Sequence, residues 1–212
     1  MLKVKICGLA TREALDVAVE AGAHYTGFVF FPPSPRSLNP VQAASLTEAV
    51  PPSVDRVGLF VDADDDYLGD VLSRVPLDMV QLHGSEPPER IDAIKARWGK
   101  LVMKAVPVAR AEDLAQIRRY EGVADWLLFD ARPPAGADRP GGNAQSFDWS
   151  LLQGLNLSLP WMLAGGINSE NVAEAVRLSG ASAVDVSSGV EDSPGIKSPE
   201  KIRAFLKTAR TI

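Results

Sequence analysis

The sequence contains a single cysteine, Cys7, at the end of its first apolar run, Lys-Val-Lys-Ile-Cys-Gly. Alternate side chains of a strand point to the same face, so Lys3, Lys5 and Cys7 would share one face. A thiol beside ammonium groups can lose its proton readily and act as a base or a nucleophile. Free cysteine is also commonly a small buried packing residue. Because one thiol can form neither an intrachain disulfide nor a structural zinc site, reactivity and packing are the two interpretations.

A carboxyl group that could complement this thiol is Asp130, at the end of another apolar run. An isomerisation needs one group that removes a proton and another that supplies one. Asp130 shares a strand face with Leu128 and can therefore point inward. The alternative is a structural carboxylate that caps a helix or pairs with Arg132. For catalysis near neutral pH, we expect the pKa of Cys7 to lie below the ordinary thiol value of about 8.5, and Asp130 to keep its proton.

Two turns rich in glycine and serine predict a phosphate site. In the first, Gly165 and Gly166 follow a short apolar run and precede a helix start. The second contains Ser188 and Gly189 after the last apolar run. Glycine lets the backbone approach an anion, and the free N–H groups at a helix N-terminus bind it. Either turn alone could be an ordinary helix cap, but the two together favour phosphate binding.

Three further polar side chains are candidates for substrate contacts. His83 shares a strand face with Gln81, and we expect it to bind or orient a substrate rather than to carry out general catalysis. Arg36 lies in the stiff segment Pro-Pro-Ser-Pro-Arg and could meet a substrate carboxylate, although a solvated loop charge fits the sequence equally well. Asp185 is predicted to pair with Lys5, because the last strand would close onto the first.

These candidates lie on a regular alternation of apolar runs and helix-forming segments. The predicted strands are residues 2–7, 25–31, 56–61, 78–82, 100–106, 125–130, 160–164 and 183–187. The predicted helices are residues 13–21, 41–50, 66–75, 89–98, 111–120, 149–152, 169–178 and 199–210. Strands that alternate with helices pair in parallel, and the helices cover the sheet.

Eight such units predict an α/β fold, a (β/α)₈ TIM barrel with eight parallel strands, as a single domain over residues 1–212. A doubly wound open sheet is the alternative, but no Gly-x-Gly-x-x-Gly follows the first predicted strand. Active sites of such barrels form at the carboxyl ends of the strands. The barrel would therefore bring Cys7, His83 and Asp130 to one rim.

The amino-acid composition argues against nucleic acid and membranes as binding partners. A net charge of −5 gives no basic footprint for nucleic acid or an anionic membrane surface, and no apolar window is long enough to span a bilayer. The first residues run directly into a strand and lack the cleavage region of a signal peptide. With one cysteine, we expect a cytoplasmic protein. No exposed heptad or apolar stripe is visible in the sequence, so we expect a monomer rather than a dimer.

Several segments together resemble the phosphoribosylanthranilate isomerase family. In chain order they are Lys-Ile-Cys-Gly-Leu, Gly-Phe-Val-Phe-Phe-Pro-Pro-Ser-Pro-Arg, Val-Gly-Leu-Phe-Val, Val-Gln-Leu-His-Gly, Phe-Asp-Trp, Ala-Gly-Gly-Ile-Asn-Ser-Glu-Asn-Val, Val-Asp-Val-Ser-Ser-Gly-Val-Glu and Pro-Gly-Ile-Lys. They extend from Lys5 to Lys197. The resemblance implies an isomerase of tryptophan biosynthesis that converts a phosphoribosyl-anthranilate into a deoxyribulose phosphate by an Amadori rearrangement.

The resemblance also implies roles for individual residues. Cys7 matches the family's general base, Asp130 its general acid, and Arg36 the residue that meets the anthranilate carboxylate. We expect further substrate contacts from His83, Gly142 and Asp185, and phosphate contacts from Gly165, Gly166, Ser188 and Gly189. The resemblance implies neither a metal nor an organic cofactor, because the substrate nitrogen serves as the electron sink. The partner it implies is a small phosphosugar.

One position departs from the family pattern. Ala144 stands where the loop after the sixth strand usually has its third glycine, and an alanine there would be strained if the backbone required positive φ.

Other barrel proteins that act on or bind phosphosugars are alternative interpretations of this sequence. A histidine-pathway isomerase would carry a carboxylate in place of Cys7, and an indole-glycerol-phosphate synthase would carry catalytic lysines. A non-catalytic phosphosugar-binding protein would be expected to lose Cys7 or Asp130, and the sequence retains both.

Overall fold

The computed structural model describes residues 1–134, 136, 139–142 and 145–212. Its barrel strands are β1 (Lys3–Cys7), β2 (Tyr25–Phe30), β3 (Asp55–Phe60), β4 (Met79–Leu82), β5 (Leu101–Val108), β6 (Trp126–Ala131), β7 (Trp161–Leu163) and β8 (Ala183–Val186). The helical segments between and after them are α1 (Arg12–Glu20), α2 (Pro40–Thr47), α3 (Asp65–Arg74), α4 (Pro88–Trp98), η1 (Ala111–Arg119), η2 (Trp149–Leu152), α5 (Val172–Ser179), η3 (Ser188–Val190) and α6 (Pro199–Ala209). The segments marked η are 3₁₀ helices. A short antiparallel hairpin of β9 (Glu191–Ser193) and β10 (Ile196–Lys197) precedes α6.

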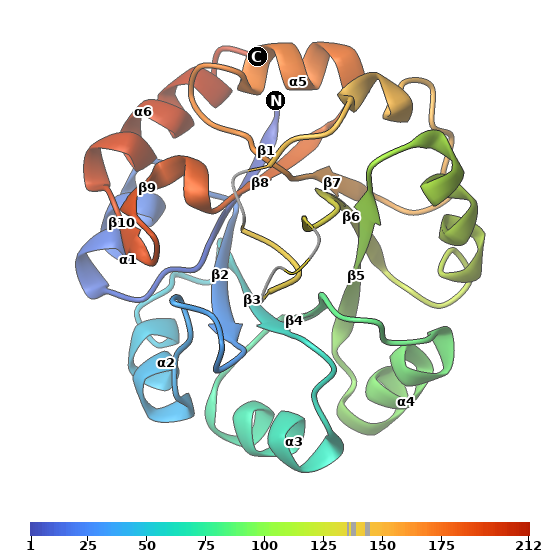
Figure 1. Cartoon of the computed structure of the whole chain (residues 1–212). Helices are drawn as coiled ribbons and strands as arrows, with labels where there is room; N and C mark the ends of the chain where they lie inside the picture. Colours follow the sequence, from blue (N-terminus) through green and yellow to red (C-terminus); the bar gives the residue numbers. More distant parts are fainter. Residues whose placement is uncertain (135, 137–138, 143–144) are drawn as a thin grey trace.

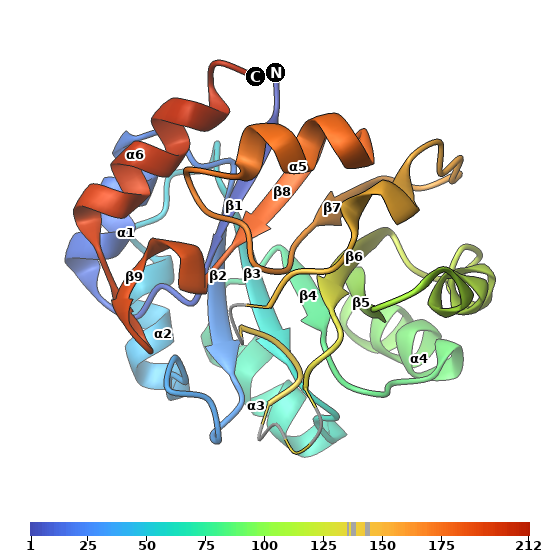
Figure 2. The ribbon, with the colours of Figure 1, turned by 45° about the horizontal axis from the view of Figure 1, so that its top comes forward.

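Strands β1 to β8 pair in chain order and close into a parallel barrel, with β8 hydrogen-bonded to β1. The helices surround the barrel, as Figures 1 and 2 show from two directions. This confirms the predicted (β/α)₈ TIM barrel and rules out the open doubly wound sheet. Parallel strands covered by helices are buried on both faces, which explains why their sequences are nearly continuous apolar runs.

The apolar core has two layers separated by the barrel wall. The inner layer fills the barrel and includes Tyr25, Val57, Met79, Met103, Ala105, Leu128, Met162, Ala164 and Ala183. The outer layer lies between the strands and the helices and contains large side chains such as Phe28, Phe60 and Phe129. Cys7 and Asp130 lie on inward-facing strand positions, directly above the inner layer. The packed interior therefore forms the floor of any site at the rim.

Most helix boundaries follow from local chemistry. Thr11 and Ser198 cap α1 and α6, since their side chains accept hydrogen bonds from backbone N–H groups three residues further on. Helix α5 begins later than predicted because the Asn168 side chain accepts from the N–H groups of Glu170 and Asn171 and holds a turn there. Among the described residues, no helix has the length and apolar character required to cross a bilayer.

Two features differ from the predicted elements. Residues 111–119 form a 3₁₀ helix, and Ile117 is the one residue of this segment that is fully buried. Regular helices are held mainly by packing of an apolar face, and here only Ile117, with Leu114 partly buried beside it, packs against the core. The β9–β10 hairpin was not predicted, because its two strands are very short and carry charged residues. Gly195 forms its turn with a φ of +86°, a conformation that glycine adopts freely.

Candidate active site

The carboxyl ends of four strands place the candidate residues around one cavity at the barrel rim. Cys7 ends β1, His83 follows β4, Asp130 lies near the end of β6, and Asp185 lies on β8. Further residues that line the cavity include Arg36, Gly142, Gly165, Gly166 and Ser188. The described residues of the segment that follows β6, yellow in Figure 1, cross the barrel opening. Ala144, whose effect on this segment was in question, lies outside the described residues.

Lys5 occupies the barrel interior beneath the cavity and pairs with Asp185. The two residues are register partners in the β1–β8 pair, and Lys5 Nζ donates to Asp185 Oδ1 at 2.9 Å. This confirms the predicted ion pair. Desolvation opposes the charge on the fully buried lysine, but the attraction of the Asp185 carboxylate and the hydrogen bonds of the ammonium group outweigh it, so the pKa of Lys5 is raised.

The pKa of Cys7 is raised, which corrects the expectation of a lowered value. Burial is the largest cause, because it disfavours the thiolate, and the Asp185 carboxylate acts in the same direction. The ammonium groups of Lys5 and Lys197 oppose this but do not reverse it. Asp185 thus offsets much of the positive field that Lys5 would otherwise exert on the sulfur. The raised pKa favours the protonated thiol over the thiolate.

Asp130 faces the cavity in contact with His83. Its Oδ1 accepts a hydrogen bond from the Ala131 backbone N–H at 2.8 Å, and its Oδ2 lies 3.2 Å from His83 Nε2. On the other side of the ring, the Gln81 side-chain amide lies 3.0 Å from His83 Nδ1 and holds the orientation of the imidazole. Arg132 pairs with Asp113 instead of Asp130. The alternative of an Asp130–Arg132 pair is therefore wrong.

The turn after β7 is shaped to receive an anion. Gly165 and Gly166 have φ values of +85° and +67°, which side-chain-bearing residues rarely adopt. Among the described residues, no backbone hydrogen bond uses their N–H groups, whereas Asn168 occupies those of Glu170 and Asn171. The available donors are therefore in the glycine turn rather than in the first turn of α5.

The second glycine turn contributes differently from what was expected. Ser188 lines the cavity, but Gly189 does not. A Cβ at Gly189 would come within 2.0 Å of the Ile167 carbonyl oxygen. Gly189 therefore allows the two turns to lie against each other, and its direct contact with a phosphate stays a prediction.

Arg36 is buried at the cavity wall, so the interpretation as a solvated loop charge is wrong. Its Nε and Nη2 donate to the two carboxylate oxygens of Glu191 at 2.7 and 2.8 Å. The pKa of Glu191 is lowered: desolvation opposes its charge, but hydrogen bonds from Arg36 and the charge of Lys197 outweigh it. The guanidinium is thus held on one edge, with its other edge turned toward Gly142 and the cavity.

Comparison with known proteins gives the family of this barrel. The model of the N-(5'-phosphoribosyl)anthranilate (PRA) isomerase family matches residues 4–208. The chain belongs to the PRA isomerase family. An N-(5'-phosphoribosyl)anthranilate isomerase of Paramagnetospirillum magneticum is 60% identical over 209 residues, covering 99% of this chain and 97% of that protein.

Two solved PRA isomerase structures each cover 100% of both chains. One is a complex with reduced 1-(o-carboxyphenylamino)-1-deoxyribulose 5-phosphate, at 38% identity and a TM-score of 0.87. The other contains monomers of the dimeric enzyme from Thermotoga maritima, at 38% identity and a TM-score of 0.86. Both likenesses extend over the whole barrel.

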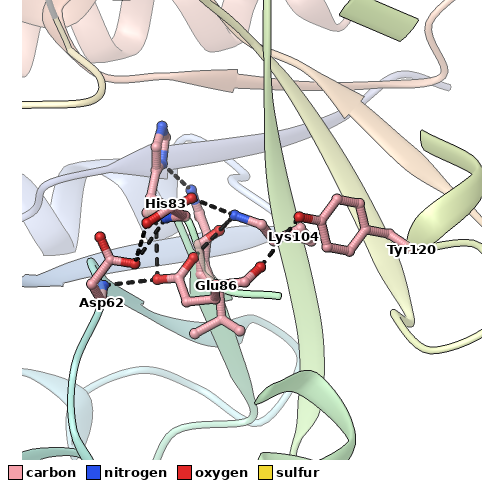
Figure 3. A network of polar contacts seen from close by, with 9 residues as sticks. Asp62, His83, Glu86, Lys104 and Tyr120 are labelled. Atoms are coloured by element: carbon pink, nitrogen blue, oxygen red, sulfur yellow. Dashed lines mark hydrogen bonds and ion pairs between the residues drawn. The ribbon is translucent and has the colours of Figure 1, made fainter. Parts of the chain in front are cut away.

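Beside the cavity lies a buried charged network that the sequence analysis missed (Figure 3). Lys104 on β5 and Glu86 after β4 have side chains that are 2% and 3% exposed, with Nζ 3.0 Å from Oε2. Lys104 also donates to the Gly84 carbonyl oxygen at 2.7 Å. Glu86 Oε1 accepts from the Asp62 and Gly84 backbone N–H groups at 2.8 and 3.2 Å. The network fixes the short segment that carries His83.

One sequence signal could have revealed this network. Lys104 interrupts the apolar run Leu-Val-Met-Lys-Ala-Val-Pro-Val, and a charge on a buried strand requires a partner. The partner could not be named, because Glu86 lies in a loop. Among the residues that the structure describes, no group of three or more His, Cys, Asp or Glu side chains is placed to hold a metal ion.

Lys104→Met tests the importance of this network for stability. It should lower the free energy of unfolding by about 3–5 kcal/mol, because the buried Glu86 carboxylate loses its charged partner. Urea unfolding curves measure the change. Arg110→Met is the matched control, since it removes an exposed pair with Glu112, 71% and 79% exposed, and should have little effect. Equal losses in the two variants would contradict the assignment.

The ionisation of Cys7 can be followed directly, because the chain has one cysteine. Burial raises the pKa of this thiol, so the thiolate should be depleted at neutral pH and should form only at a pH above the midpoint of free cysteine. The thiolate's ultraviolet absorbance, measured against pH with Cys7→Ser as the blank, gives the midpoint. A midpoint below that of free cysteine would show that the ammonium groups outweigh desolvation.

Proposed function

We propose that this chain is a phosphoribosylanthranilate isomerase of tryptophan biosynthesis. It converts N-(5'-phosphoribosyl)anthranilate into 1-(2-carboxyphenylamino)-1-deoxyribulose 5-phosphate by an Amadori rearrangement. The observation that carries the proposal is a single cavity lined by a thiol, a carboxyl group, a guanidinium and a glycine turn with free N–H groups. Membership of the PRA isomerase family over nearly the whole chain supports the choice of substrate.

Asp130 is the general acid of the proposed reaction. It donates a proton to the ring oxygen of the ribose as the bond between that oxygen and the first ribose carbon breaks. The lone pair of the anthranilate nitrogen moves toward the same carbon and forms a positively charged iminium. His83, in contact with Asp130 Oδ2, orients the carboxyl group toward the cavity. The proton transfer requires Asp130 to enter the reaction in its protonated form.

Cys7 is the general base of the second step. Its thiolate removes the proton from the second ribose carbon, and the released electron pair forms a double bond to the first carbon while neutralising the nitrogen. The resulting enolamine then tautomerises to the ketone. A cation within a few ångströms favours an anion, so the iminium formed in the first step promotes ionisation of a thiol that burial otherwise keeps protonated.

The remaining residues anchor the two charged ends of the substrate. Arg36 receives the anthranilate carboxylate with the edge of its guanidinium that Glu191 leaves free. The phosphate lies on the N–H groups of Gly165 and Gly166, with Ser188 nearby. Contacts from Gly142, Asp185 and Gly189 complete the proposed binding set. Holding both ends fixes the ribose between acid and base, which is the geometric requirement for the reaction.

The proposed reaction requires neither a metal nor an organic cofactor, because the substrate's own nitrogen donates its lone pair in the first step and recovers an electron pair in the second. Its small-molecule partner is the phosphosugar itself. A monomeric state and a cytoplasmic location stay predictions from the sequence. The related enzyme from Thermotoga maritima is dimeric, and size-exclusion chromatography of this chain tests the prediction of a monomer.

The test is the loss of anthranilate fluorescence when the purified protein meets freshly prepared phosphoribosylanthranilate. Cys7→Ser and Asp130→Asn should each lower turnover by about two to four orders of magnitude, the usual contribution of a general acid or base. Both substitutions preserve size, so thermal unfolding should stay close to that of the wild type. Full turnover combined with a raised KM in either variant would contradict the assigned roles, and no turnover by the wild type would contradict the function.

A further inference from the structure

The β9–β10 hairpin packs against the loop that carries Arg36, a residue of the cavity wall. Glu191, the first residue of β9, has a side chain that is 4% exposed and holds Arg36 through two hydrogen bonds. At the hairpin turn, a Cβ on Gly195 would come within 2.6 Å of the Pro35 carbonyl oxygen. The hairpin therefore contacts the Arg36 loop at two separate points, one polar and one through close backbone packing.

Glu191 also binds a second buried cation. Lys197 on β10 is paired with it across the hairpin, and Lys197 Nζ donates to Glu191 Oε1 at 2.7 Å. The same ammonium donates to the Ser187 carbonyl oxygen at 2.9 Å and lies 3.2 Å from Ser187 Oγ. Its three N–H donors are thus all directed at protein acceptors. Lys197 is not a lining residue of the cavity, whereas Ser187 is.

The orientation of the Arg36 guanidinium follows from these contacts. A guanidinium has five N–H donors in a fixed plane. Glu191 takes the edge formed by Nε and Nη2, and the direction of the remaining Nη1 is then set by the plane. Nη1 lies 2.6 Å from the position that a Cβ on Gly142 would occupy, at the cavity wall. Nη2 also donates to the Gly142 carbonyl oxygen at 3.4 Å, so the two shorter hydrogen bonds to Glu191 are the main constraint on the guanidinium plane.

We propose that Glu191 is a positioning residue that aims Arg36 at the carboxylate of the substrate, with Lys197 holding Glu191 in place from the other side. This inference rests on the proposed function, since it assumes that Arg36 receives a carboxylate. Glu191 is not among the residues that line the cavity. Its effect is on selectivity: the carboxylate of the ligand is recognised only while Glu191 fixes the plane of the guanidinium. Such fixed, bidentate geometry is what an arginine offers over a lysine.

Two non-reacting ligands separate this role from a general structural one. The first is the reduced Amadori product, which carries the aromatic carboxylate, and the second is the same molecule with a plain phenyl ring. Their inhibition constants are measured against the turnover of phosphoribosylanthranilate. We expect the wild type to bind the carboxylated ligand about tenfold to hundredfold more tightly, as a charge-assisted hydrogen bond does.

Glu191→Gln should lose most of this preference while binding the phenyl ligand almost as the wild type does. Glu191→Asp is the second variant. It keeps the negative charge between Arg36 and Lys197, so it should fold, but its shorter side chain cannot reach both guanidinium nitrogens, and the preference should again fall. Asp192→Asn is the matched control, because Asp192 is the next residue of β9 and forms an exposed ion pair with Lys201 at 3.0 Å. It should keep the full preference.

Three outcomes would overturn the inference. One is that both Glu191 variants keep the full preference for the carboxylated ligand. Another is that they weaken both ligands equally, which is the result of a merely structural role. The third is a wild type that turns over phosphoribosylanthranilate but shows no preference, in which case the proposed function stands and carboxylate anchoring by Arg36 fails. A wild type that does not turn over phosphoribosylanthranilate would contradict the proposed function, and with it the inference that rests on that function.

Discussion

The rest of the site depends on the ion pair that the buried ammonium group of Lys5 forms with Asp185. This ammonium group lies where β8 closes onto β1, 2.9 Å from Asp185 Oδ1, and its charge also acts on the sulfur of Cys7. The same charge therefore contributes to barrel closure and to the chemistry of the thiol. Removing either partner of such a pair leaves an unpaired charge in the interior, which is far more costly than an apolar pair of the same shape.

The rim repeats this arrangement at two further places, with a different task in each. Glu191 lies between Arg36 and Lys197 at one side of the cavity, and Glu86 holds Lys104 at the other. In each case a carboxylate that touches no substrate in our proposal fixes the position of a cation or a loop. Groups at a site must be held within fractions of an ångström of a productive geometry, and buried charge pairs with several hydrogen bonds provide that rigidity.

The barrel could be predicted from the sequence, and so could the rim at which the candidate residues gather around one cavity. Strand and helix periodicities are local properties, and the rule that active sites lie at the carboxyl ends of strands places Cys7 and Asp130 together. The Lys5–Asp185 pair followed from face and register. The direction of the Cys7 pKa did not, because desolvation depends on the whole packed environment. The Arg36–Glu191 pair joins residues 155 positions apart, and no local pattern marks such a pair. The β9–β10 hairpin was missed because its strands have only three and two residues and carry charged side chains.

The burial of Cys7 has a consequence for the lifetime of the protein. Peroxides and related oxidants attack thiolates, whereas a protonated thiol reacts slowly. Burial leaves 4% of Cys7 exposed and raises the pKa of its thiol, and both effects slow conversion of the sulfur to sulfenic and sulfinic acids. The desolvation that delays its ionisation is therefore also a form of chemical protection for the one residue of this kind in the chain.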